Sequence, residues 1–212
     1  MRYLLFLLSG FPFYFLGAQT IDTLVEQSTK DFPVQTQIAI AILEDGNTTF
    51  HGYQITTKDL VPIENHTYCF EIGSITKVMT SHLLVQAVEE GVIDLNKPIR
   101  KYLGYKLKKN PKITPLQLSN HTSGLPRLPD NILPLVRQAP DNPYQQYTEA
   151  LLKTYLTKEL YLDYQPGEGM AYSNLGTGIL GHILSKAWKK SYEDLLQEQL
   201  FEPLGMTHTH TN

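Results

Sequence analysis

The stretch Phe70-Glu71-Ile72-Gly73-Ser74-Ile75-Thr76-Lys77 marks the point where the sequence changes from a strand pattern to a helix pattern. After Ser74, apolar residues recur at helical spacing as far as Gly91, a residue typical of helix C-terminal ends. Before it, residues 37–43 form a nearly unbroken apolar run, and residues 50–55 are the expected partner strand. The two expected strands therefore precede Ser74, and the segment after Ser74 is mostly helical.

Between the two expected strands, Asp45-Gly46 favours a hairpin turn. Amphipathic or capped helical segments are predicted elsewhere at 20–30, 114–120, 131–138, 149–160 and 174–188, and after Ser191. A two-stranded hairpin is marginal alone, and an apolar edge such as 37–43 needs neighbouring strands. We therefore expect further strands of the sheet after residue 212, so that the chain is a C-terminally truncated piece of a larger fold.

Ser74 and Lys77 have the spacing of an activated nucleophile. A serine hydroxyl attacks poorly unless a base takes its proton, and a lysine three residues later on a helix returns to the same face. The positive end of a helix also favours a developing oxyanion. Alone, the pair is weak evidence, because Ser-x-x-Lys arises by chance about once per 200 residues at ordinary composition. An N-cap serine with a solvated lysine is then the simpler interpretation.

Two later motifs are equally weak when taken alone. In Tyr172-Ser173-Asn174, a tyrosine beside a lysine can serve as general base, and the amide of Asn174 can donate to a substrate carbonyl. A packing tyrosine and a capping asparagine are the structural alternatives. His121-Thr122-Ser123-Gly124-Leu125-Pro126 has the composition of a turn, in which a histidine is more often structural than catalytic.

The order of these motifs is more informative than any one of them. Residues 70–77 resemble the first motif of class C β-lactamases, within the serine β-lactamase and penicillin-binding-protein superfamily. Residues 90–99 and 121–126 resemble segments that follow in that family. Pro166-Gly167, Tyr172-Ser173-Asn174 and Pro203-Leu204-Gly205-Met206 are similar to its second motif region and the helix beyond. The resemblance covers about residues 20 to 210.

The resemblance implies Ser74 as the acylated nucleophile, Lys77 as its proton-acceptor partner and Tyr172 as general base. It also implies Asn174 as a contact to the substrate amide, and the Ser74 N–H as one of two oxyanion donors. The implied fold is α/β (α+β) and β-lactamase/transpeptidase-like, with an antiparallel sheet lobe packed on an all-helical lobe. Family members end with strands carrying a Lys/His-x-Gly motif, and no such segment follows Met206.

Composition excludes other classes. With 42% hydrophobic and 18% charged residues the chain is of the ordinary globular type, and a net charge of −3 gives no reason to expect binding to nucleic acid, which needs a basic face. Met1-Arg2 and the apolar run that follows predict a signal peptide over residues 1–18, cleaved after Ala18, and hence a periplasmic or secreted protein without a transmembrane anchor. The alternative is an uncleaved N-terminal anchor. Cys69, the only cysteine, is expected to be buried.

The predicted domains are the signal peptide (1–18) and a partial β-lactamase-related domain (19–212). The latter divides into sheet-lobe elements (19–70) and a mostly helical part (71–212). The leading hypothesis is a serine hydrolase that forms an acyl-enzyme with a β-lactam, a cell-wall peptide or a small ester, without cofactor or metal. His208 and His210 are poor evidence for a metal. Alternatives are a non-catalytic remnant that binds peptidoglycan or a partner, and a chain that does not fold stably. We expect the 212-residue chain alone to be inactive or very weakly active.

Overall fold

The computed structural model describes residues 20–57 and 59–211, so the predicted signal peptide lies outside the described residues. The contacts divide the chain into two compact units, one ending at Glu71 and the other beginning at Ile72. This division falls one residue from the boundary expected from the sequence. The assignment of both units to one partial domain stays a prediction.

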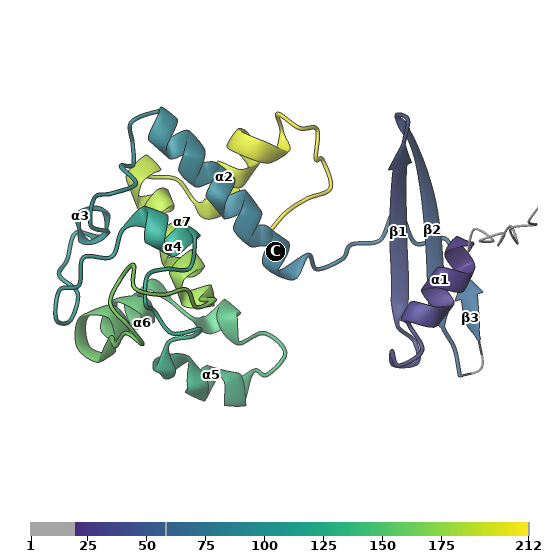
Figure 1. Cartoon of the computed structure of the whole chain (residues 1–212), viewed down its shortest axis with the longest axis horizontal. Coiled ribbons are helices and arrows are strands. Elements are labelled where there is room, and N and C mark those ends of the chain that lie inside the picture. Colours follow the sequence, from purple (N-terminus) through teal and green to yellow (C-terminus); the bar gives the residue numbers. More distant parts are fainter. Residues whose placement is uncertain (1–19, 58, 212) are drawn as a thin grey trace, which may run out of the picture. The chain divides into compact units, whose positions relative to one another are not determined.

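The N-terminal unit combines one helix with a small antiparallel sheet, visible in Figure 1. Its elements are α1 (Ile21–Ser28), β1 (Gln37–Glu44), β2 (Asn47–Ile55) and β3 (Leu60–Pro62), with the sheet order β1-β2-β3. Ile38 pairs with Tyr53, and the turn between β1 and β2 holds Asp45 at φ 48° and Gly46 at φ 79°. Positive φ at both turn residues matches the twist of a hairpin, which confirms the expected Asp-Gly turn.

Two contacts attach α1 within this unit. The hydroxyl of Tyr53, on β2, donates a 2.5 Å hydrogen bond to the carboxylate of Asp22. Val25, one turn further along α1, is buried. Desolvation, reinforced by the bond to Asp22, raises the pKa of Tyr53 to about 12, so this phenol stays a donor at neutral pH. The helix is thus held to the strands by one apolar and one polar contact.

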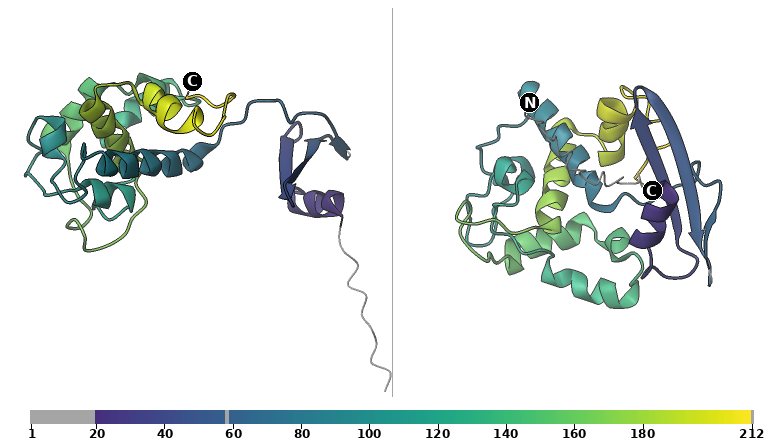
Figure 2. Two further views of the ribbon diagram at one scale, coloured as in Figure 1. Left: turned by 90° about the horizontal axis from the view of Figure 1, so that it is seen from above. Right: turned by 45° about the vertical axis from the view of Figure 1, so that its right-hand side comes forward.

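The C-terminal unit is helical, as the views in Figures 1 and 2 show. Its α-helices are α2 (Thr76–Glu89), α3 (Arg100–Leu103), α4 (Pro115–Ser119), α5 (Leu133–Gln138), α6 (Glu149–Thr154), α7 (Asn174–Trp188) and α8 (Tyr192–Leu196). Short 3₁₀ turns are η1 (Gly73–Ile75), η2 (Asp130–Ile132) and η3 (Pro143–Gln146), and π-helical turns are η4 (Tyr155–Glu159) and η5 (Gln197–Phe201).

Helix α7 lies at the centre of this unit's core. Five of its apolar residues recur at three- and four-residue spacing and are buried: Leu175, Ile179, Leu180, Ile183 and Leu184. It packs against α2, α3, α4 and α8. From α2, Leu83, Leu84 and Ala87 enter the same core. Both long helices predicted from apolar periodicity are confirmed. Because α2 and α7 pack in the same core, their N-terminal ends are held in place relative to each other.

Several features differ from the sequence-based expectation, among them the unexpected short strand β3. The helix expected over 149–160 ends as an α-helix at Thr154 and continues as the π-helical turn η4, which buries Tyr155 and Leu156 side by side. Ser74 lies in the 3₁₀ turn η1 rather than in the α-helix that follows. Cys69 is exposed, not buried, because it lies in the segment between β3 and η1, which contributes nothing to the core cluster.

Two kinds of feature are absent from the part of the chain that the structure describes. None of the helices in residues 20–57 and 59–211 is both long enough and apolar enough to cross a membrane. Within the same residues, no group of three or more His, Cys, Asp and Glu side chains is placed to hold a metal ion.

Candidate active site

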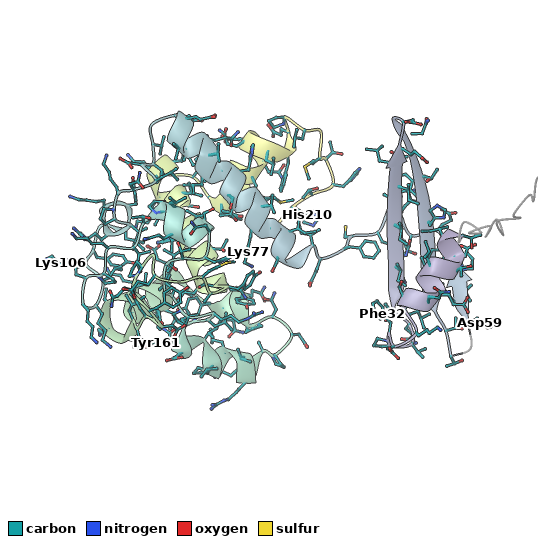
Figure 3. All side chains as sticks on the ribbon, in the orientation of Figure 1. Phe32, Asp59, Lys77, Lys106, Tyr161 and His210 are labelled. Atoms are coloured by element: carbon teal, nitrogen blue, oxygen red, sulfur yellow. The ribbon has the colours of Figure 1, made fainter. Side chains whose placement is uncertain are left out.

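Ser74 and Lys77 meet at the N-terminal end of α2. Gly73, with φ 52°, opens the 3₁₀ turn η1, so Ser74 comes just before the first α-helical turn. Lys77, labelled in Figure 3, is three residues further on, and its Nζ donates a 3.1 Å hydrogen bond to Ser74 Oγ. Ser74 is exposed and Lys77 half-buried. The hydroxyl therefore faces solvent with a cation directly beside it.

Tyr172 joins this pair although it is 98 residues from Ser74 in sequence. Its hydroxyl lies 2.5 Å from Ser74 Oγ, and Lys77 Nζ lies 4.7 Å from the centroid of its ring. Hydrogen bonding to Lys77 and then to Ser74 lowers the pKa of Tyr172 below its ordinary value of 10.0, and the nearby charges of Lys77 and Arg127 act in the same direction. The phenol is thereby biased toward phenolate, the form that can accept a proton.

The loop His121–Pro126 positions Tyr172 from both sides. The carbonyl oxygen of His121 accepts the N–H of Ala171 at 3.0 Å, and its imidazole Nδ1 accepts the N–H of Ser173 at 3.3 Å. Between these anchors, the rings of His121 and Tyr172 are 4.7 Å apart and tilted by 37°. Burial, followed by the charge of Lys77, lowers the pKa of His121, so the imidazole stays neutral and Nδ1 remains an acceptor. His121 itself is held at φ 62°, a conformation that is uncommon outside glycine.

Backbone contacts extend this arrangement along the loop. The carbonyl of Gly124 accepts the N–H of Asp163 at 2.9 Å, and that of Thr122 accepts the N–H of Gly167 at 2.8 Å. Gly124 has φ 74°, and a Cβ there would lie 2.1 Å from the carbonyl oxygen of Tyr164. Glycine is therefore required at this close approach.

Ser173 links the loop to α7. It is buried, its Oγ donates to the carbonyl of Pro126 at 2.7 Å, and the same oxygen accepts the N–H of Gly176 at 2.9 Å as the N-cap of α7. The middle residue of Tyr172-Ser173-Asn174 thus has a structural role. Of its two neighbours, Tyr172 contacts the hydroxyl of Ser74, and Asn174 lines the cavity next to that hydroxyl.

Asn174 and the Ser74–Lys77 pair line one cavity of about 620 Å³. Asn174 is the first residue of α7, and its Oδ1 is buried with no hydrogen-bond partner among the described residues. Buried amide oxygens are normally paired. An unpaired one on a cavity wall can accept a hydrogen bond from a bound molecule.

The four site residues selected from the sequence are thus within one region of the helical unit. Sequence reasoning missed two others. His121 was interpreted as part of a turn, yet its ring packs on Tyr172. The other is Arg127, which belongs to none of the motifs and whose Cζ lies 5.3 Å from the centroid of the Tyr172 ring. Its position directly after Pro126 was the only available signal.

Comparison with known proteins places this arrangement in a family. Residues 25–212 match the family model described as Beta-lactamase. The D-alanyl-D-alanine-carboxypeptidase/endopeptidase AmpH of Escherichia coli K12 is 30% identical over 186 residues, covering 82% of this chain and 45% of that protein.

Solved structures agree on the fold. The D-alanine carboxypeptidase AmpC of Burkholderia cenocepacia superimposes with a TM-score of 0.66 at 30% identity, covering 89% of this chain and 48% of that one. The octameric penicillin-binding protein homologue of Pyrococcus abyssi gives a TM-score of 0.69 at 28% identity, with coverage of 87% and 42%. The chain spans about half the length of these relatives and has the α/β fold of β-lactamases and transpeptidases. It belongs to the β-lactamase family.

Proposed function

We propose that the protein is a serine hydrolase that reacts through an acyl-enzyme on Ser74. The observation that carries this proposal is the position of Ser74 Oγ, 2.5 Å from the Tyr172 hydroxyl and 3.1 Å from Lys77 Nζ. A hydroxyl with an adjacent proton acceptor and an adjacent cation has the arrangement of an activated nucleophile. An N-cap role for Ser74 is disfavoured, because Ile75 occupies the N-cap position of α2 and the hydroxyl of Ser74 contacts Tyr172 and Lys77 instead.

The proposed step begins with Tyr172 as phenolate. It takes the proton of Ser74 Oγ as Oγ forms a bond to the substrate carbonyl carbon, and Lys77 stabilises the negative charge on both oxygens. The N–H of Ser74 donates to the oxyanion. As the carbonyl re-forms, the bond to the leaving group breaks, and the proton on Tyr172 passes to that group. A water molecule then repeats the sequence on the ester of Ser74 and releases the acid.

The proposed substrates are β-lactams, cell-wall peptides or small esters. The matched relatives carry the names β-lactamase and D-alanyl-D-alanine-carboxypeptidase/endopeptidase, so an acyl group attached through a strained or ordinary amide is the shared chemistry. Asn174 supplies the amide contact proposed for such a substrate. The choice among these classes is set by the walls around Ser74 rather than by the reacting groups.

The test is identification of the acylated residue. The complete protein, with any sequence that follows residue 212, is incubated with a penicillin and, separately, with a p-nitrophenyl ester, and the adduct is located by peptide mass spectrometry. We expect the acyl group on Ser74 and its loss in Ser74→Ala. A label on Ser123 or Ser173, or undiminished labelling of Ser74→Ala, contradicts the proposal. Ligand binding without any adduct or turnover favours the alternative of a non-catalytic protein that binds peptidoglycan or a partner.

We also propose that the protein is exported to the periplasm or secreted, with cleavage after Ala18. The support is the short basic start followed by an apolar run and a small residue at the cleavage point. N-terminal sequencing of the mature protein from the cell envelope or medium should begin at Gln19. A cytosolic product that begins at Met1 contradicts this assignment.

A further inference from the structure

The net charge of −3 conceals one strongly basic segment, residues 97–112, which we call the basic loop. It contains α3 and contributes seven of the chain's 18 Lys and Arg residues, but none of its 21 Asp and Glu residues. The rest of the chain has the other eleven basic side chains and all of the acidic ones. Positive charge is therefore concentrated in this one stretch of the helical unit.

The fold turns the apolar side chains of the basic loop inward. Ile99, Leu103 and Leu107 are buried and belong to the core cluster. The N–H of Ile99 donates to the carbonyl of Ile113 at 2.8 Å, so the two ends of the loop meet. Because the apolar positions are held in the core, the charged side chains between them lie on the outer side of the loop.

Four lysines of the basic loop are exposed and unpaired. None of the four forms an ion pair with another described residue, whereas Lys97 lies 3.5 Å from the carboxylate of Asp94. Like charges on one loop repel each other, and a partner of opposite charge relieves that repulsion. The four are Lys101, Lys106, Lys109 and Lys112.

The neighbouring α6 and η4 add to this charge. Lys108 Nζ donates to the carbonyl of Glu159, next to η4, at 3.4 Å. Lys153 Nζ, from α6, lies 5.4 Å from the centroid of the Tyr105 ring in the basic loop. Lys153 and Lys158 are both exposed, and the carboxylate of Glu159 offsets one of the charges. The basic surface therefore extends beyond the loop itself.

The basic loop lies apart from the cavity that contains Ser74. None of its residues lines that cavity, nor the smaller one of about 310 Å³ lined by residues of α6 and α7. Figure 3 shows Lys106 at one edge of the helical unit, well away from Lys77. A partner bound to the basic loop would therefore leave the Ser74 cavity open.

The residue types of the loop select the kind of partner. Six of its seven basic residues are lysines, whose ammonium is a point charge rather than the planar fork with which arginine holds a single phosphate. Because the loop lines neither cavity, its charges suit an open surface rather than one enclosed ligand. Clusters of about 4–8 Lys and Arg residues are typical of binding to anionic lipid headgroups.

We propose that the basic loop, together with Lys153 and Lys158, is a docking surface for a bilayer rich in anionic phospholipid. The contact is electrostatic and stays at the level of the headgroups, because the apolar side chains of the loop are committed to the core. The inference goes beyond the acylation of Ser74. It draws only on the proposed export, which brings the protein to the outer face of the cell membrane.

The test measures binding of the complete protein, with any sequence that follows residue 212, to vesicles. Sucrose-loaded vesicles of phosphatidylglycerol mixed with phosphatidylcholine are sedimented, and the bound fraction gives a partition coefficient. Vesicles of phosphatidylcholine alone are the comparison. We expect binding to the anionic vesicles only. Raising the ionic strength from about 0.1 M to about 1 M shortens the screening length from about 10 Å to about 3 Å and should release the protein.

Glutamine at the four unpaired lysines tests the loop itself. A lysine near an anionic surface contributes about fivefold to the partition coefficient, so the quadruple variant should bind on the order of 10²–10³-fold more weakly. Arginine at the same four positions keeps the charge and should keep the binding. The matched control removes four exposed charges elsewhere and should bind nearly as the unmodified protein does. It combines Lys30→Gln, Arg137→Gln, Lys186→Gln and Lys189→Gln.

The proposal is overturned if the unmodified protein does not bind anionic vesicles, if the quadruple glutamine variant binds equally well, or if the matched control loses as much. Tighter binding to soluble polyphosphate than to vesicles, per phosphate, would identify a linear polyanion as the partner and also overturns it. If circular dichroism shows that the quadruple variant is unfolded, Lys106→Gln combined with Lys109→Gln replaces it, with an expected loss of about 25-fold. Vesicle binding involves no chemistry at Ser74, so its failure does not bear on the proposed function.

Discussion

The imidazole of His121 lies against the ring of Tyr172, with 4.7 Å between the ring centroids, while His121 also accepts hydrogen bonds from the two residues that flank this tyrosine. The histidine thus holds the proposed general base through a ring contact and through hydrogen bonds on both sides of it. It makes no direct hydrogen bond to Ser74 Oγ, whose partners are Tyr172 and Lys77. Its effect on the reaction must therefore pass through the position of Tyr172.

We expect His121→Asn to slow acylation while leaving the protein folded. Asparagine tolerates the left-handed backbone of residue 121, but it removes the ring that packs on Tyr172. Small displacements of a reacting group cost up to about 10²-fold in rate. His121→Phe keeps an aromatic ring and loses the acceptor for the Ser173 N–H, so the two variants separate ring contact from backbone anchoring. Stopped-flow acylation rates that are normal in both variants would show that neither the ring contact nor the hydrogen bond to Ser173 N–H is needed to position Tyr172.

Lys77→Ala and Tyr172→Phe should each slow acylation by about 10²–10⁴-fold, the usual contribution of general acid–base groups. Each change removes one of the two polar contacts to Ser74 Oγ. Circular dichroism should show an intact fold, since both side chains lie outside the core cluster. Lys97→Ala and Tyr161→Phe are matched controls of the same residue types. A near-normal rate in Tyr172→Phe would exclude this phenol as the proton acceptor, and a near-normal rate in Lys77→Ala would exclude Lys77 as the cation that supports the transfer.

Loss of the Arg127 charge should move the acid limb of the rate profile to higher pH. The reaction requires Tyr172 as phenolate, so the rate rises as pH passes the pKa of this phenol. Lys77 and Arg127 both lower that pKa, Ser74 does so by hydrogen bonding, and neutral His121 faces the same ring. In Arg127→Gln the pKa of Tyr172 rises. The pH dependence of kcat/KM should show this shift, and Arg127→Lys should reverse most of it.

Arg137→Gln, which removes an arginine from α5, is the control for a general effect of net charge. An equal displacement of the acid limb in Arg137→Gln would attribute the shift to overall charge rather than to the cation beside Tyr172.

Gly124→Ala should lower the free energy of unfolding by about 2–5 kcal/mol, from roughly 1–2 for a left-handed backbone and roughly 1–3 for overpacking. Its Cβ would lie 2.1 Å from the carbonyl oxygen of Tyr164. Gly91 also has a positive φ, 72°, but a Cβ there meets nothing within 4 Å. Gly91→Ala therefore isolates the backbone contribution of about 1–2 kcal/mol. Urea unfolding measures the free energy of unfolding of both variants. Equal decreases would show that the backbone at Tyr164 moves to make room for the added Cβ.

Apolar spacing was sufficient to predict α2 and α7, because each has enough buried positions to reveal its period. Elements such as α3 and η3 are only four residues long and have no period to detect. The change from α6 to η4 is also not predicted, because the apolar spacing that continues through Tyr155 and Leu156 fits an unbroken α-helix.

For the site, spacing along a helix predicted the contact between Ser74 and Lys77. Tyr172 was assigned from the resemblance to a family, and nothing in the local sequence places it 98 residues away beside Ser74. His121 was interpreted as structural because a turn motif explains its neighbours fully. Its contact with Tyr172 exists only in three dimensions, across 51 positions of the chain.

The contacts of the loop that contains Gly124 have a consequence for the search for distant relatives. The loop is joined to the segment 163–175 largely through peptide groups, with acceptors at Thr122, Gly124 and Arg127. Peptide groups are the same for every amino acid, so most side chains of this loop can be substituted in evolution without loss of these backbone hydrogen bonds. The number of residues in the loop and the glycine at position 124 must be preserved. A search profile built on loop length and that single glycine should therefore recover homologues in which residue-by-residue similarity has faded.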